Sequence, residues 1–124
     1  IYSTYCYRME LLKAEGFPCV MVPGVPSFCA VAARLGRSLT EPDQPLHIIP
    51  GGGPGLGEAL DLPGSKVLMQ AGRNHQKLLE ELEARKLLDR AAMVENCGLP
   101  EERPFADLTG KPDSNGYFTT VIIP

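Results

Sequence analysis

The stretch PGVPSFCAVAARLG at residues 23–36 contains a chain turn, the start of a helix and its end. Its Pro-Gly pair stops the apolar run at residues 19–22, which is typical of a short strand buried on both faces. Ser27 is a suitable N-cap for a helix over residues 28–35, and Gly36 is suitable just past its end. Strand ends and helix starts are where open α/β sheets bind ligands. The segment therefore predicts an α/β fold with a candidate site at this turn.

Helical and strand patterns alternate around this segment, and strands then follow one another toward the end of the chain. Asn74 is a suitable N-cap for a long helix, and Pro104 places its strand at a sheet edge or at the strand's first residue. The patterns predict helices over residues 5–15 and 75–87, one helical turn at 58–62, and strands at 46–49, 66–69, 91–94, 103–108 and 117–123. This order predicts a single α/β domain over residues 1–124, with a mixed (parallel and antiparallel) sheet flanked by helices.

Composition argues against two classes of protein. The 124 residues carry a net charge of -3, no Trp, four Tyr and four Phe. A nucleic-acid-binding domain usually has a basic surplus or aromatic stacking platforms. No apolar run approaches the roughly 18 residues of a membrane span, and the start shows no signal peptide. We therefore expect neither a nucleic-acid partner nor a membrane partner.

The cysteines do not predict a metal site. None of them belongs to a Cys-x-x-Cys pair, and neither His47 nor His75 is near any of them in the sequence: Cys6, Cys19, Cys29 and Cys97. Zinc ligands usually come in close pairs. Scattered cysteines in a chain of this size are typical of reduced thiols in a cytoplasmic protein.

No familiar catalytic or phosphate-binding pattern is present. The loop GGGPGLG at residues 51–57 has neither the spacing of a dinucleotide-binding fingerprint nor the Lys of a P-loop, which favours a flexible surface loop. No Ser-His-Asp or Cys-His order is persuasive, and the carboxylates of Glu101, Glu102 and Asp107 have no apolar setting that would raise a pKa. The catalytic residues are therefore unknown at this stage.

Residues 23–36 closely resemble a segment of the tetrapyrrole (corrin/porphyrin) methyltransferases, which reads P-G-[IV]-[ST]-[SA]-x-x-A-x-A-A-x-[LA]-G. Three further segments fit the family. IYSTY at residues 1–5 looks like the residues after its G-D-P motif, VLMQAGRN at 67–74 is similar to its V-L-M-K-x-G-R-N, and GYFTTVI at 116–122 looks like its last strand. The best fit is with the branch that methylates C20 of precorrin-2 in cobalamin (vitamin B12) biosynthesis.

The resemblance implies a larger protein. The family has two α/β domains with S-adenosylmethionine (SAM) in the cleft between them, and this chain resembles only the C-terminal domain. The N-terminal SAM-binding half is absent from residues 1–124, so we expect the fragment to be inactive alone. The resemblance also implies a homodimer and, as substrate, precorrin-2 or its cobalt-loaded counterpart, cobalt-factor II.

By position, the resemblance implies that ten residues contact SAM: Tyr2, Ser3, Pro26, Ser27, Met69, Asn96, Cys97, Gly98, Thr119 and Thr120. Pro26 stands where the family usually has Ser or Thr, and Gln70 stands where it has Lys. From the residues alone, Met69 fits equally well as a core residue, and the two threonines as strand formers. Methyl transfer needs little acid–base help, because the sulfonium is already activated and alignment in a dry cleft supplies much of the acceleration.

Two alternatives stay open at the level of sequence. One is another member of the same superfamily, acting at a different corrin position or on ribosomal RNA or diphthamide; the acidic balance counts against RNA. The other is a non-catalytic interaction module that retains the fold.

Overall fold

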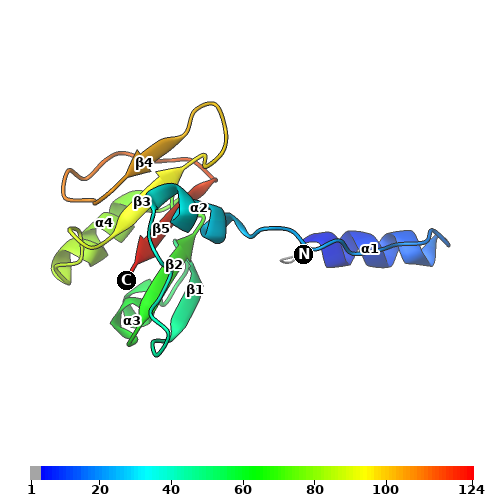
Figure 1. The fold of residues 1–124 in the computed structure, drawn as a ribbon, viewed down its shortest axis with the longest axis horizontal. Coiled ribbons are helices and arrows are strands. Elements are labelled where there is room, and N and C mark those ends of the chain that lie inside the picture. Colours follow the sequence, from blue (N-terminus) through cyan, green and yellow to red (C-terminus); the bar gives the residue numbers. More distant parts are fainter. Residues whose placement is uncertain (1–3) are drawn as a thin grey trace.

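The computed structural model describes residues 4–124, so the expectations for Tyr2 and Ser3 lie outside the described residues. One five-stranded sheet has the order β1-β2-β5-β3-β4 (Figure 1). The elements, in chain order, are α1 (Thr4–Ala14), α2 (Ser27–Leu35), β1 (Leu46–Pro50), α3 (Leu56–Asp61), β2 (Ser65–Met69), α4 (His75–Ala84), β3 (Ala92–Glu95), β4 (Arg103–Phe105) and β5 (Thr119–Ile123). The predicted mixed sheet flanked by helices is confirmed.

Strand pairing brings four strand ends to one edge of the sheet. β1 and β2 are parallel, whereas β5 is antiparallel to both β2 and β3. Pro50 therefore lies beside Met69, Met69 lies opposite Thr120, and Glu95 lies opposite Thr119. The ends of β1, β2 and β3 thus meet the start of β5, the strand at the centre of the sheet.

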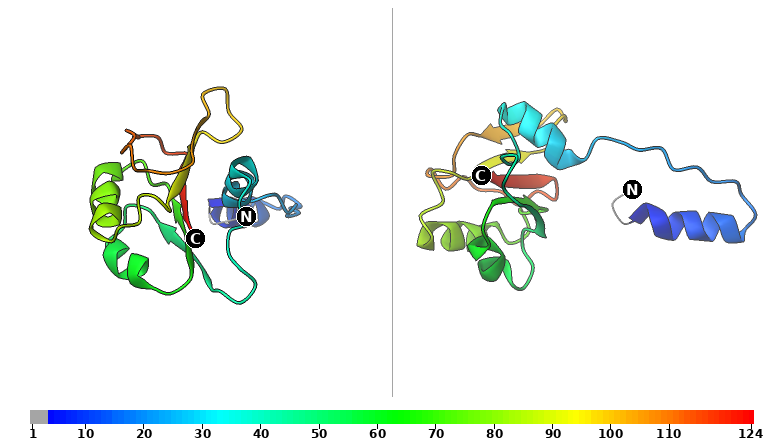
Figure 2. Two further views of the ribbon diagram at one scale, coloured as in Figure 1. Left: turned by 60° about the vertical axis from the view of Figure 1, so that its left-hand side comes forward. Right: turned by 60° about the horizontal axis from the view of Figure 1, so that its bottom comes forward.

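Helices cover both faces of the sheet. α2 lies on one face, and α3 and α4 lie on the other (Figure 2). Successive side chains of a strand point to opposite faces, which divides the strands between two cores. The first core combines Val67, Val94 and Ile122 with Val31 of α2. The second combines Leu68, Met93, Val121 and Ile123 with Leu56 and Leu60 of α3 and with Leu78, Leu79 and Leu82 of α4.

Neither of the two predicted N-cap residues caps its helix with a side-chain hydrogen bond. α2 begins at Ser27 itself, with Pro26 in the N-cap position, and the Ser27 hydroxyl lies 3.9 Å from Met69 Sδ. Asn74 does occupy the N-cap position of α4, but its side-chain amide donates to the Gly52 carbonyl at 2.6 Å. Both polar side chains therefore join segments that are distant in the sequence. Gly36 ends α2 with a φ of 63°, as predicted.

The strand predicted at residues 19–22 is wrong. Residues 17–26 form an irregular connection between α1 and α2, and Val20 and Val22 are 80% and 77% exposed. A strand needs a neighbour for its backbone hydrogen bonds, and within residues 4–124 no strand pairs with this segment. Pro104, by contrast, lies in the edge strand β4, as predicted.

α1 lies apart from the sheet (Figures 1 and 2). None of the residues of α1 is buried, and the Tyr5 hydroxyl donates to the Val20 carbonyl at 2.7 Å. Several large apolar side chains of α1 and the following connection are exposed: Tyr7, Leu11, Leu12, Phe17, Val20, Met21, Val22 and Val25. As for membranes, the helices described between residues 4 and 124 are too short or too polar to span one.

Candidate functional site

Two adjoining hollows open at the sheet edge where β1 and β2 end. The apolar pocket, of about 370 Å³, is lined by Ser27, Val31, Met69, Gln70, Cys97, Leu99, Tyr117, Phe118 and Thr120. The polar cleft, of about 530 Å³, is lined by Pro50, Gly51, Gly52, Gly53, Met69, Gln70, Gly72, Arg73, Asn115 and Tyr117. Met69, Gln70 and Tyr117 line both hollows, so the two lie side by side. The carboxyl ends of parallel strands are the usual ligand-binding edge of an α/β sheet.

Met69 joins three of the elements that build the apolar pocket. It is the last residue of β2, and its thioether sulfur lies 3.9 Å from Ser27 Oγ of α2 and 4.0 Å from Thr120 Oγ1 of β5. Val31 and Thr120 are buried, whereas Leu99 is about half exposed at 48%. The pocket therefore has apolar walls, two hydroxyls and the size of a small-molecule site.

The glycine loop beside the polar cleft is tied to its neighbours, although the sequence favoured a flexible surface loop. The Gly51 amide donates to the Met69 carbonyl at 2.7 Å, and the Gly52 carbonyl accepts from Asn74. A Cβ at Gly51 would lie only 2.7 Å from the Ala71 Cα. Only glycine permits that approach between the two backbones.

A second close contact joins the two sides of the polar cleft. A Cβ at Gly72 would lie 2.1 Å from the Gly116 carbonyl oxygen, so backbone packs on backbone there. Gln70, with a φ of 56°, donates from Nε2 to the Tyr117 hydroxyl at 2.5 Å. Residues 70–74, which include Arg73, are therefore held against residues 115–117.

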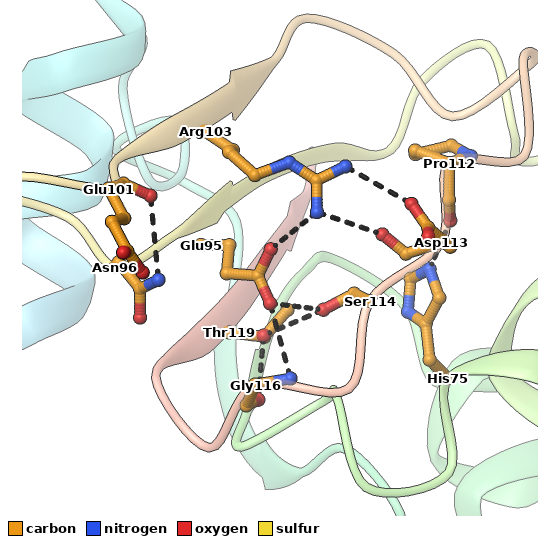
Figure 3. A network of polar contacts seen from close by, with 10 residues as sticks. All are labelled: His75, Glu95, Asn96, Glu101, Arg103, Pro112, Asp113, Ser114, Gly116 and Thr119. Carbon is orange, nitrogen blue, oxygen red and sulfur yellow. Dashed lines mark hydrogen bonds and ion pairs between the residues drawn. The ribbon is translucent and has the colours of Figure 1, made fainter.

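A buried carboxylate anchors the loop that carries Asn115 (Figure 3). Glu95 is 5% exposed and accepts hydrogen bonds from Arg103 Nη1 at 2.9 Å, Ser114 Oγ at 3.0 Å and the Gly116 amide at 3.1 Å. Arg103 also pairs with Asp113 at 3.1 Å. These contacts fix the course of residues 113–116, which place Asn115 at the polar cleft and lead to Tyr117.

Cys97 is held at the apolar pocket by a neighbouring ion pair. Glu102 pairs with Arg34 of α2 and accepts from the Gly98 amide at 2.8 Å. The Gly98 hydrogen bond, together with Arg34, lowers the pKa of the Glu102 carboxyl. Burial, followed by the negative charge of Glu102, raises the pKa of the Cys97 thiol above its ordinary value of 9.0. The thiol is therefore neutral at physiological pH.

Eight of the ten residues proposed for SAM contact lie in the described chain. Four of them line the apolar pocket together: Ser27, Met69, Cys97 and Thr120. The other four lie beside it without lining it: Pro26, Asn96, Gly98 and Thr119. The role of all ten in binding SAM stays a prediction.

The residues outside the pocket have partners of their own. The Pro26 carbonyl accepts from the amides of Cys29 and Ala30 at 3.0 and 3.2 Å. The Asn96 amide donates to the Phe118 carbonyl at 2.9 Å. Thr119, fully buried, donates from Oγ1 to the Gly116 carbonyl at 2.8 Å.

Several site residues were missed because they carry no chemical signal in the sequence. Tyr117 and Phe118 were expected within the last strand, yet β5 begins at Thr119, and both aromatic residues precede it as exposed rims of the site. Their rings contact edge to face, with centroids 5.2 Å apart. Arg73 stood inside a recognised motif, but nothing in the sequence places it beside the glycine loop.

Comparison with known proteins relates the sequence of this chain to one family. A sequence model of the tetrapyrrole (corrin/porphyrin) methylases matches residues 1–112. The chain belongs to this family. The precorrin-2 C(20)-methyltransferase of Sinorhizobium sp is 29% identical over 126 residues, which cover 99% of this chain and 51% of that protein. The cobalt-precorrin-2 C(20)-methyltransferase of Salmonella typhimurium is 31% identical, with 99% and 53% covered. This tetrapyrrole methylase chain thus spans about half the length of these relatives.

Solved structures show the same fold. A cobalt precorrin-4 methyltransferase superposes with a TM-score of 0.72 at 20% identity, covering 99% of this chain and 59% of that one. A uroporphyrin-III C-methyl transferase from Thermus thermophilus, complexed with S-adenosyl homocysteine, superposes with a TM-score of 0.64 at 20% identity, with 98% and 60% covered. At these identities the likeness establishes the architecture of the tetrapyrrole methylase chain and leaves its ligands to be argued from the site.

Proposed function

We propose that this chain forms one wall of the SAM site of a methyltransferase that acts on C20 of precorrin-2 or cobalt-factor II. The observation that carries the proposal is the apolar pocket at the end of β2, where Ser27, Met69 and Thr120 converge from three elements. Two relatives named for C20 methylation support the position on the macrocycle.

The residues of the apolar pocket fit SAM by their chemistry. When bound, SAM supplies a methyl group on an activated sulfonium. The apolar side chains of Val31 and Leu99 offer surface to an adenosyl group, and the hydroxyls of Ser27 and Thr120 offer hydrogen bonds. Because the thiol of Cys97 is neutral, it places no negatively charged nucleophile beside the sulfonium. The role of the chain is to bind, align and exclude water.

The proposal includes a second half that completes the site. The chain covers about half the length of its C20-methylating relatives, and the exposed apolar side chains of α1 and residues 17–25 offer a surface for further protein. We propose that the whole enzyme is a cytoplasmic homodimer and that residues 1–124 alone are inactive. One wall alone binds weakly, because each 1.4 kcal/mol of lost contact reduces affinity about tenfold.

A chemical-shift titration tests the donor site on the chain itself. S-adenosylhomocysteine at millimolar concentration should shift the backbone amides of Ser27, Met69, Cys97 and Thr120 in a ¹⁵N-labelled chain, with a Kd no tighter than about 1 mM. Leu99→Trp should abolish these shifts by filling the pocket mouth. Leu62→Trp, at a similarly exposed leucine outside both hollows, should leave them intact. Shifts confined to other residues would sink the proposal, and micromolar affinity would remove the claim of an incomplete site.

A chimera tests the position of methylation. The chain is fused behind the N-terminal half of the Salmonella relative, and micromolar binding of S-adenosylhomocysteine first shows that the site is assembled. Incubation with precorrin-2 and SAM carrying a ¹³C-methyl group should then place the label on C20 by NMR. A label at another ring position would refute C20 specificity while leaving the donor site in place.

A further inference from the structure

We infer that the polar cleft binds a carboxylate side chain of the tetrapyrrole, with the guanidinium of Arg73 as its ion-pair partner. The inference rests on the proposed function, which it extends from the methyl donor to the macrocycle. Arg73 follows Gly72 in the segment between β2 and α4 and lines the polar cleft together with Asn115 and Tyr117.

The charge of Arg73 is not neutralised within the chain. The described residues that line the polar cleft include no Asp or Glu. Within residues 4–124, Arg34, Arg85 and Arg103 pair with carboxylates, whereas Arg73 makes no ion pair, nor do Arg8, Arg37 and Arg90. Of these four arginines, Arg73 is the one that lines the polar cleft. In a chain with 15 acidic and 12 basic residues, an unpaired arginine beside a hollow points to an anion from outside.

The backbone on both sides of Arg73 is fixed. Gly72 packs directly on Gly116, and the Asn74 side chain holds the Gly52 carbonyl at 2.6 Å. The segment of Gly116 is in turn anchored by the buried Glu95 (Figure 3). A charged group on a rigid backbone loses less freedom on binding than one on a mobile loop.

The polar cleft also lies where the macrocycle is needed. It shares Met69, Gln70 and Tyr117 with the apolar pocket, so a molecule held by Arg73 lies next to the proposed donor site. Precorrin-2 carries acetate and propionate side chains around its ring. The planar guanidinium matches a carboxylate with two parallel hydrogen bonds. One side chain bound at Arg73 would therefore set which edge of the ring faces the donor.

Uroporphyrin III, a fluorescent tetrapyrrole with the same kinds of carboxylate side chains, is the probe. Its fluorescence anisotropy is measured against the chain, Arg73→Gln, Arg73→Lys and Lys86→Gln. Lys86 is the matched control, because it is exposed, lies beyond the far end of α4 and lines neither hollow. Arg73→Gln should weaken binding roughly tenfold, and Arg73→Lys should recover only part of that loss. Lys86→Gln should bind like the unmodified chain.

The outcomes separate this inference from the proposed function. Equal weakening in Lys86→Gln, or no weakening in Arg73→Gln, overturns the Arg73 site. A competition experiment can also overturn it. If inorganic phosphate displaces uroporphyrin at a lower concentration than the dicarboxylate succinate does, the cleft prefers a different anion. In Arg73→Gln the shifts caused by S-adenosylhomocysteine should stay unchanged. If S-adenosylhomocysteine caused no such shifts even in the unmodified chain, while uroporphyrin binding still depended on Arg73, only the proposed donor site would be refuted.

Discussion

The thiol of Cys97 provides a titratable reporter on the wall of the apolar pocket. Burial and the charge of Glu102 raise its pKa above 9.0, so its thiolate forms only at higher pH. In Glu102→Gln the nearby negative charge is gone and Arg34 loses its partner, while the burial remains. We expect the midpoint of Cys97 alkylation by iodoacetamide to fall in this variant and still to exceed the ordinary thiol value. Peptide mass spectrometry across a pH series measures it.

The matched control for this prediction is Glu101→Gln, which removes the neighbouring exposed carboxylate. The carboxylate that raises the pKa of the Cys97 thiol belongs to Glu102 and not to Glu101. Its alkylation midpoint should therefore equal that of the unmodified chain. An equal fall in both variants would show that net charge, and not the Glu102 contact, controls the thiol.

Sequence motifs predicted the residues of the pocket that lie on regular elements. Ser27, Met69 and Thr120 stand at a helix start, a strand end and a strand start, and motif matching places such residues well. Arg73 and Tyr117 reach the site only because Gly72 and Gly116 bring two loops into backbone contact. That approach depends on the absence of two Cβ atoms between distant segments, and no local pattern reports it.

At the scale of elements, the loop over residues 113–116 depends on one buried acceptor. Glu95→Ala would remove the carboxylate that accepts from the Ser114 hydroxyl and the Gly116 amide, and would leave Arg103 paired with Asp113 alone. We expect the free energy of unfolding to fall by about 1–3 kcal/mol. The Gly116 amide should also exchange its hydrogen faster. Urea unfolding and hydrogen exchange followed by NMR measure the two effects.

Asp113→Asn is the control for this loop. Its side chain is 98% exposed and pairs with the same arginine, so water replaces the lost ion pair. We expect a change in unfolding free energy of less than about 0.5 kcal/mol. Similar effects in the two variants would mean that Arg103, and not the buried Glu95 acceptor, holds the loop.

The apolar run at residues 19–22 shows that local composition alone does not predict a strand. Its composition is typical of a buried strand, yet Val20 and Val22 are exposed and unpaired in the described chain. Composition reports what a segment is suited to, whereas pairing depends on a second strand beside it. The edge position of Pro104 was predictable for the opposite reason, because a missing amide hydrogen is a property of the residue itself.

At the scale of the molecule, the chain has a well-buried part, the sheet with the helices on its faces, and an exposed part, α1. The sheet and the helices on its faces share two cores, and β5 at the centre is buried along its whole length. α1 contributes no residue to either core. The fold class followed from the order of the elements, but this division did not, because α1 has an ordinary helical sequence.

Hydrogen exchange in the isolated chain should reveal that division. A helix of 11 residues with no buried side chain is marginal in water, so the amides of α1 should exchange nearly as fast as an unstructured peptide. The amides of β5 should exchange only with global unfolding, several orders of magnitude more slowly. NMR at two protein concentrations measures both. Protection of α1 that rises with concentration would show that a second copy covers its apolar side chains. Protection at every concentration would contradict the prediction, since the helix would then be stable without a partner.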